Sequence, residues 1–180
     1  MRTRFKYRLK SEVDLGTLKG PLIITPNHRS YFDAYAVLAA FPLKSGVHPI
    51  HTMAADWLYK NMFRRFYLNA VHAIPTLKGQ GLEKSLEAPE KTLKTGGTVG
   101  IFPEGGLNSD GANGGVAEKA RVGAVLLSQH AGAPILPVGI KIEKNICNVF
   151  IGKPYSIAGL DTESARMLVM EKIKQQYQTL

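Results

Sequence analysis

A histidine and an aspartate five positions apart are the residues of this chain whose types and spacing best suit catalysis. They are His28 and Asp33 in the stretch NHRSYFDAY, residues 27–35. If His28 lies in a turn and Asp33 in the first turn of the helix that follows, the two side chains can meet. Asp33 would then orient the imidazole and support its protonated form, and the helix N-terminus would keep resting His28 neutral. This arrangement predicts a general base at His28.

The same stretch also has a purely structural interpretation. Ser30 followed three residues later by Asp33 fits the capping-box pattern, and the run AYAVLAAF after it favours a helix. On this interpretation Asp33 only caps a helix that begins at Ser30, and His28 is a loop histidine. The stretch by itself leaves both interpretations open.

Segments typical of strands and of helices alternate along the chain. The apolar runs predict strands near 21–25, 47–53, 70–74, 97–102, 134–141 and 147–152. The remaining patterns predict helices near 30–41, 56–67, 80–94, 118–130 and 161–177. Pro89 is expected to interrupt or restart the helix near 80–94. The alternation indicates a single α/β domain with a mixed, mostly parallel sheet flanked by helices.

The charge of the chain favours an anionic partner. Its 180 residues carry a formal net charge of +9. Every even position from Arg2 to Lys10 is basic, so an extended chain would place these five side chains on one face. We expect residues 1–20 to form a basic segment, either a solvated edge or a membrane contact, and residues 21–180 to form the domain. No apolar run approaches the ~20 residues that span a bilayer, so any membrane association is expected to be peripheral.

Several other site chemistries find little support in the residues. His48 and His51 would point to opposite faces of a strand, so no metal site is expected. No G-x-S-x-G serine elbow occurs. The glycine-rich segment 105–115 matches neither a P-loop nor a dinucleotide fingerprint. That segment is either a plain flexible loop or a source of main-chain N–H groups near a reaction centre. Cys147, the single cysteine, is expected to be a buried strand residue.

A second motif, GIFPEGGLNSDG at residues 100–111, changes how the first is interpreted. The two together resemble the phospholipid/glycerol acyltransferase family, to which bacterial 1-acylglycerol-3-phosphate acyltransferases belong. That family carries N-H-x-S-x-x-D and, some seventy residues later, F-P-E-G. Further blocks resemble the family in order: AIPTLK at 73–78, RVGAVLLSQHAG at 121–132, APILPVGI at 133–140 and IGKP at 151–154. The resemblance runs from about residue 20 to the end of the chain.

The resemblance implies a glycerol-phosphate acyltransferase-like fold and transfer of a fatty acyl group from a thioester to a lysophospholipid-type hydroxyl. It implies His28 as the base, Asp33 as its orienting partner and no acyl-enzyme. The donor would be acyl-CoA or acyl-carrier protein, used as a substrate, with no cofactor. The enzyme is expected on the cytoplasmic, inner face of an anionic membrane and not on nucleic acid. The residues expected to bind substrate are Asn27, Ser30, Lys78, Phe102, Pro103, Glu104, Gly105, Gly106, Leu107 and Arg121.

Two departures from the family pattern concern the acceptor. Many members have Thr-Arg after F-P-E-G, where this chain has Gly106-Leu107. A lysine common in the second block is replaced by a residue that we identify as Ala55 in MAADW. Lys78, Lys119 or Arg121 would then compensate, or the acceptor is a lysolipid or glycolipid other than lysophosphatidate.

Two alternatives to acyl transfer remain open at this point. A thioesterase on the same scaffold would use water in place of the acceptor hydroxyl. A basic nucleic-acid-binding module would need aromatic residues interleaved with basic ones on one surface. KNMFRRFY at 60–67 is the cluster of that composition, and it fits an amphipathic helix better.

Overall fold

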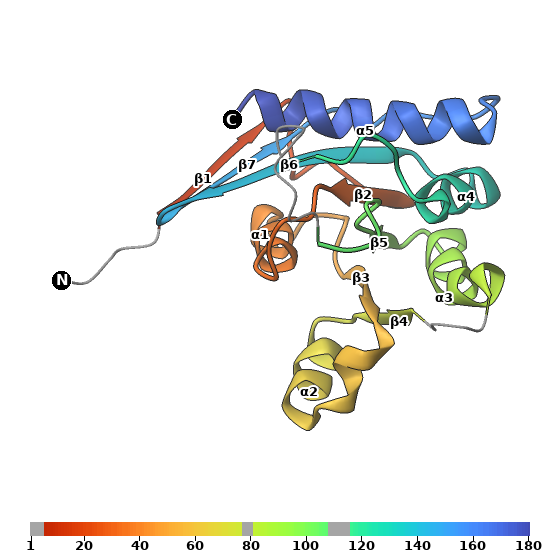
Figure 1. The fold of residues 1–180 in the computed structure, drawn as a ribbon, viewed down its shortest axis with the longest axis horizontal. Helices are drawn as coiled ribbons and strands as arrows, with labels where there is room; N and C mark the ends of the chain where they lie inside the picture. Colours follow the sequence, from red (N-terminus) through yellow and green to blue (C-terminus); the bar gives the residue numbers. More distant parts are fainter. Residues whose placement is uncertain (1–5, 77–80, 108–115) are drawn as a thin grey trace.

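A seven-stranded sheet forms the centre of this computed structural model, which describes residues 6–76, 81–107 and 116–180. The strand order is β1-β7-β6-β2-β5-β3-β4 (Figure 1). In chain order the strands are β1 (Lys6–Ser11), β2 (Leu22–Pro26), β3 (Ile50–Ala55), β4 (Ile74–Thr76), β5 (Thr98–Gly100), β6 (Ile135–Glu143) and β7 (Ile146–Ile151). Neighbouring strands are parallel except in the β6–β7 hairpin. The prediction of a mixed, mostly parallel α/β sheet is confirmed.

Helices cover both faces of the sheet. On one face lie α3 (Leu82–Lys94), α4 (Val122–Ala131) and α5 (Thr162–Gln178), and on the other lies α1 (Asp33–Ala40) (Figure 1). The central strand β2 is buried along its whole length. Its Ile23 packs into the cluster formed with α3, α4 and α5, whereas Ile24 packs into the cluster formed with α1. This burial on both faces explains why the strand reads as a continuous apolar run.

One part of the chain lies outside these two layers. After β3 the chain forms the short helix η1 (Asp56–Lys60) and then α2 (Met62–Ala70) before it returns as β4. The two helices lie beyond the β3–β4 end of the sheet (Figure 1). The helix expected near 56–67 is therefore present, as two shorter helices. None of the helices in the described ranges is long and apolar enough to cross a membrane.

Pro89 does not interrupt its helix, and that prediction was wrong. Helix α3 is continuous from Leu82 to Lys94 with Pro89 inside it. Leu86, Pro89 and Leu93 are the buried residues of α3 and fall on one helical face. The free energy gained by burying the proline ring offsets the loss of the helical hydrogen bond that proline, which has no N–H, cannot make.

The strands differ from the prediction in two places. The strand expected near 70–74 is shifted, because α2 continues to Ala70 and β4 begins at Ile74. Lys6–Ser11, within the basic segment 1–20, forms the edge strand β1 beside β7. The Tyr7 hydroxyl donates to the carbonyl of Ala36, 2.9 Å away, and so ties this strand to α1. Residues 6–11 therefore belong to the same sheet as the rest of the chain, and Arg2 and Arg4 lie outside the described residues.

Strand β6 and helix α5 approach each other closely at Gly139. A Cβ at this position would lie 2.5 Å from the Tyr177 nitrogen and 2.6 Å from the Gln176 carbonyl carbon. These neighbours are backbone atoms, so the helix itself would have to move. We expect Gly139→Ala to lower the free energy of unfolding by about 1–3 kcal/mol, as overpacked cores do.

Urea denaturation followed by circular dichroism would measure the loss. Gly106→Ala is the matched control, because no atom lies within 4 Å of the added Cβ there. Equal stability of the two variants would show that α5 can shift from β6 without cost.

Candidate active site

His28 and Asp33 meet at the carboxyl end of β2. His28 lies in the turn after the strand, and Asp33 is the first residue of α1. Nδ1 of His28 is 3.1 Å from Oδ2 of Asp33. The His28 side chain is 18% exposed, whereas Asp33 is buried. The turn-and-helix geometry expected from the sequence is thus present, and His28 is the member of the pair that a substrate can reach.

One oxygen of Asp33 organises the whole turn. Besides the His28 ring, Oδ2 accepts the main-chain N–H of Arg29 at 2.6 Å and that of Ser30 at 2.7 Å. A carboxylate oxygen accepts, so we assign the proton of the His28 ring to Nδ1. Nε2 is then left with its lone pair, as a general base requires.

Half of the expected capping box forms around the same carboxylate. The Ser30 N–H donates to the Asp33 side chain, as the capping box requires. The Ser30 hydroxyl, however, accepts from Phe32 N–H at 3.1 Å instead of from Asp33 N–H. The helix consequently begins at Asp33 rather than at Ser30. The carboxylate therefore holds both the turn before the helix and the imidazole of His28.

The second motif packs directly on the first. β5 is the parallel neighbour of β2, so both strands end at the same edge of the sheet. Oε1 of Glu104 accepts the main-chain N–H of His28 at 2.8 Å. The Phe102 ring stacks on the His28 ring with centroids 4.0 Å apart. The second motif thus holds His28 in two places: Glu104, 76 residues further along the chain, holds its backbone, and Phe102 covers its ring.

Asn27 has a different place from the one expected. It is completely buried, and its side chain bonds to the main chain of Ile140 in β6. Its Nδ2 donates to the Ile140 carbonyl at 2.9 Å, and its Oδ1 accepts the Ile140 N–H at 2.7 Å. Both ends of the amide are engaged in the protein interior, so Asn27 ties the turn to β6.

Arg121 and the F-P-E-G turn lie against each other. The Arg121 N–H donates to the Pro103 carbonyl at 2.6 Å. Gly105 has a φ of +74°, and a Cβ there would lie 2.7 Å from Cγ of Arg121. Glycine thus permits both the turn and the close approach of the arginine. Gly106 and Leu107 follow in exposed positions. Among the positions expected to bind substrate, Lys78 lies outside the described residues, as do residues 108–115 of the glycine-rich segment.

Two contacts around the site could not be predicted from local sequence patterns. Arg29 Nη1 donates to the Tyr177 hydroxyl at 3.1 Å, which ties the turn to α5. The second contact is the stacking of Phe102 on His28, although both residues belong to the two motifs.

Cys147 is buried, as expected. Its burial, and to a smaller extent the charge of Asp33, raise the pKa of its thiol, so the thiol stays protonated near neutral pH.

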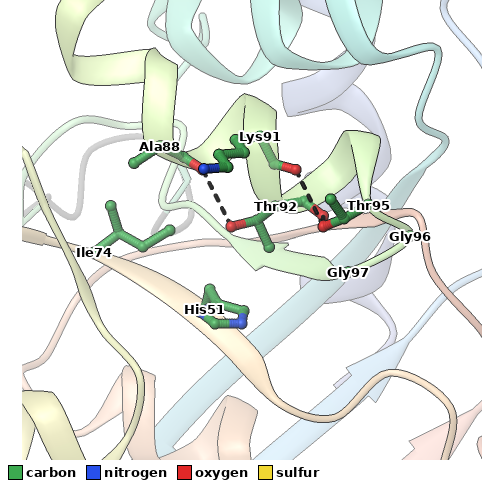
Figure 2. Close-up of a pocket in the computed structure, with 8 residues that line it drawn as sticks. All are labelled: His51, Ile74, Ala88, Lys91, Thr92, Thr95, Gly96 and Gly97. Atoms are coloured by element: carbon green, nitrogen blue, oxygen red, sulfur yellow. Dashed lines mark hydrogen bonds between the residues drawn. The ribbon is translucent and has the colours of Figure 1, made fainter.

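A separate cleft lies at the opposite end of the strands. It has a volume of about 530 Å³ and opens between α3 and the β3–β4 pair (Figure 2). Gly96 and Gly97 line it just before β5 begins, so it lies at the amino ends of the strands and away from His28. Its other lining residues are His51, Ile74, Ala88, Lys91, Thr92 and Thr95. In the parts of the chain that the structure describes, no three His, Cys, Asp or Glu side chains gather as a metal site would need.

Known proteins resemble this chain in sequence and in fold. The family model described as Acyltransferase matches residues 4–141. A 1-acyl-sn-glycerol-3-phosphate acyltransferase of Bacillus subtilis (strain 168) is 30% identical over 115 residues, 59% of this chain and 55% of the relative. The chain thus spans about half the length of this relative.

A solved structure shares the fold. It is the crystal structure of the 1-acyl-sn-glycerophosphate (LPA) acyltransferase PlsC from Thermotoga maritima, with a TM-score of 0.69 and 21% identity. The match covers 96% of this chain and 71% of that one.

The buried amide of Asn27 leads to a stability prediction. Asn27→Ala removes a buried donor and acceptor pair, and each unpaired group costs about 1–3 kcal/mol. We expect the free energy of unfolding to fall by about 2–5 kcal/mol, measured by urea denaturation. Asn148→Ala is the control, because its Nδ2 bond to the Lys141 carbonyl is long, at 3.5 Å, and only partly buried. Equal losses in the two variants would contradict the role given to Asn27.

Proposed function

The chain belongs to the acyltransferase family, and we propose that it moves a fatty acyl group from an acyl thioester to the hydroxyl of a lysophospholipid-type acceptor. The observation that carries this proposal is the His28–Asp33 pair, held at 3.1 Å and fixed from the second motif by Glu104. The pair supplies Nε2 on a partly exposed ring that Asp33 holds at Nδ1 and Phe102 covers on one face. Such a base is what a hydroxyl needs in order to attack a thioester.

The reaction needs one attack and one proton shuttle. The acceptor hydroxyl gives its proton to Nε2 of His28 while its oxygen attacks the thioester carbonyl. Asp33 stabilises the imidazolium that forms. The tetrahedral intermediate then expels the carrier thiolate, which takes the proton from His28. A C–O bond has replaced the C–S bond, His28 is neutral again, and no acyl-enzyme has formed.

The developing oxyanion needs a main-chain donor. The N–H groups of Arg29 and Ser30 are engaged by Asp33, and that of Gly105 donates to the Phe102 carbonyl at 3.1 Å. Gly106 follows the turn in an exposed position, and we propose its N–H as a donor to the oxyanion. One such donor is typically worth about 10²–10³ in rate.

The donor and acceptor classes follow from the family resemblance and from the relative. Acyl-CoA and acyl-carrier protein are the two candidate donors, and neither requires a cofactor. The acceptor is 1-acylglycerol-3-phosphate or a related lysolipid, bound near Arg121 and the F-P-E-G turn. We place the reaction at the cytoplasmic, inner face of an anionic membrane, with the protein bound peripherally, because the substrates are lipids and the net charge is +9.

Loss of the base should abolish turnover without unfolding the protein. We expect His28→Ala to lower kcat/KM by about 10²–10⁴ or more, because general-base catalysis is worth that much. Asp33→Asn should cost less than His28→Ala but at least about 10² in kcat/KM, through loss of orientation and charge support. The measurement is acyl transfer to lysophosphatidate from each donor, read by mass spectrometry, with circular dichroism to check the fold.

His130→Ala is the matched control, since it removes an exposed histidine of α4. Near-normal turnover in both site variants would mean that the turn serves only to cap α1. Release of free fatty acid from the donor without acceptor, with no acylated product, would identify a thioesterase instead.

Leu107 is expected to influence which acceptor is preferred. Arginine binds a phosphate monoester through paired, charge-assisted hydrogen bonds. At the position where many family members have that arginine, this chain has Leu107, which is apolar and 38% exposed. Ala55 ends β3, beside β5 at the same edge of the sheet. We expect the wild type to acylate another lysolipid or a glycolipid at least as well as lysophosphatidate. Leu107→Arg should raise the ratio of kcat/KM values in favour of lysophosphatidate.

The test measures, in wild type and in Leu107→Arg, the ratio of kcat/KM for lysophosphatidate to kcat/KM for the other acceptor. Leu160→Arg adds the same charge on an exposed loop before α5 and is the control. A wild type that strongly prefers lysophosphatidate would contradict the prediction, and would mean that Arg121, Lys119 or Lys78 binds the phosphate.

A further inference from the structure

Helix α2 turns its apolar side chains toward solvent. Met62, Phe63 and Phe66 are 75%, 79% and 78% exposed. At 100° per residue they fall within about 100° of one another, so they form one stripe along the helix. Trp57 of η1, 41% exposed, lies next to this helix, because the Arg64 guanidinium is 5.9 Å from its ring centroid. We call these four residues the α2 surface.

Helix α2, which carries this surface, is connected by aromatic contacts to the start of α1. Tyr67 of α2 stacks on Tyr35 of α1 with centroids 5.1 Å apart, and Tyr35 contacts Phe32 at 6.3 Å. Phe32 is 68% exposed and is the N-cap residue of α1. Asp33 follows it directly, so a chain of rings leads from the exposed helix to the residue that orients His28.

Basic side chains accompany the apolar ones. Lys60, Arg64 and Arg65 are exposed, and Asp56 is the single acidic residue between positions 56 and 70. Exposed Phe and Met beside Trp, Arg and Lys is the composition of helices that lie in a membrane interface. Trp in particular is enriched at the interface between an apolar phase and water.

We propose that the α2 surface inserts into the headgroup region of an anionic lipid bilayer and brings the start of α1, with His28, to the membrane. This inference rests on the proposed function, because an acyltransferase for lysolipids must take its acceptor from a bilayer. The cationic side chains match anionic headgroups and the apolar stripe matches the acyl-chain boundary. The aromatic chain from Tyr67 to Phe32 would then lie along the route between bilayer and base.

The single tryptophan of the protein makes the test direct, because Trp57 is part of the surface. Full-length protein is mixed with vesicles of phosphatidylcholine alone or with added phosphatidylglycerol. We expect tryptophan emission to shift to shorter wavelength and to be quenched by lipids brominated along the acyl chain, more strongly with the anionic vesicles. Vesicle binding with no change in emission and no quenching would overturn the proposal.

Charge substitution locates the contact. Phe63→Glu/Phe66→Glu places two carboxylates in the stripe and should weaken binding to anionic vesicles at least about tenfold in flotation assays. Both side chains are highly exposed, so the fold should survive. The control is Leu160→Glu/Met167→Glu, which makes the same charge change at exposed apolar residues before and within α5. Equal binding by the two double variants would overturn the proposal.

Turnover measurements distinguish a failure of this proposal from a failure of the proposed function. Phe63→Glu/Phe66→Glu should retain turnover of a short-chain acceptor in solution and lose turnover of acceptor embedded in vesicles. Absence of turnover in every arm would count against the proposed function. Fluorescence and flotation would still show whether the α2 surface contacts the membrane. Concentration-dependent emission without lipid, together with a dimer in sedimentation, would assign the α2 surface to a second copy of the chain and overturn the membrane contact.

Discussion

The site depends on one buried carboxylate oxygen. Oδ2 of Asp33 accepts from two main-chain N–H groups and faces Nδ1 of His28, all within 3.1 Å. The N–H groups belong to the turn that leads into α1, so the bonds that hold this turn also position the ring. A charge-assisted bond to a buried acceptor is stronger than a neutral one, and its loss leaves several groups without partners. The shape of the turn before α1 and the orientation of the His28 ring therefore depend on the same oxygen.

The remaining supports reach this turn from three different strands or helices. Glu104 holds the His28 N–H from the end of β5, Asn27 ties the turn to β6, and Arg29 binds Tyr177 of α5. These partners are brought together because β6, β2 and β5 are adjacent and α5 packs on β6 through Gly139. The turn is thus fixed to rigid elements, which is how a site keeps a base in one orientation.

The burial of apolar side chains differs between the sheet and α2. The central strands bury their apolar residues on both faces of the sheet. In α2 none of the side chains with described burial is buried, and three large apolar ones are exposed. Burying apolar surface is worth about 25 cal/mol per Å², so an unburied stripe offers favourable free energy to whatever covers it. Its aromatic link to α1 gives that surface a structural connection to the turn that carries His28.

The sequence by itself determined the features whose partners are close along the chain. The alternation of strands and helices follows from local periodicity, and His28 meets Asp33 because five residues of turn and helix start leave little choice of geometry. Tertiary structure decided the rest. Glu104, Ile140 and Tyr177 meet the turn across separations of 76, 113 and 148 residues, which strand order and register set and no local pattern encodes. The same applies to Pro89, which packing retains inside a helix, and to α2, whose amphipathic pattern predicted a helix but not that its apolar face would lie outside. Periodicity shows which residues share a face, whereas only the assembled sheet shows whether anything covers it.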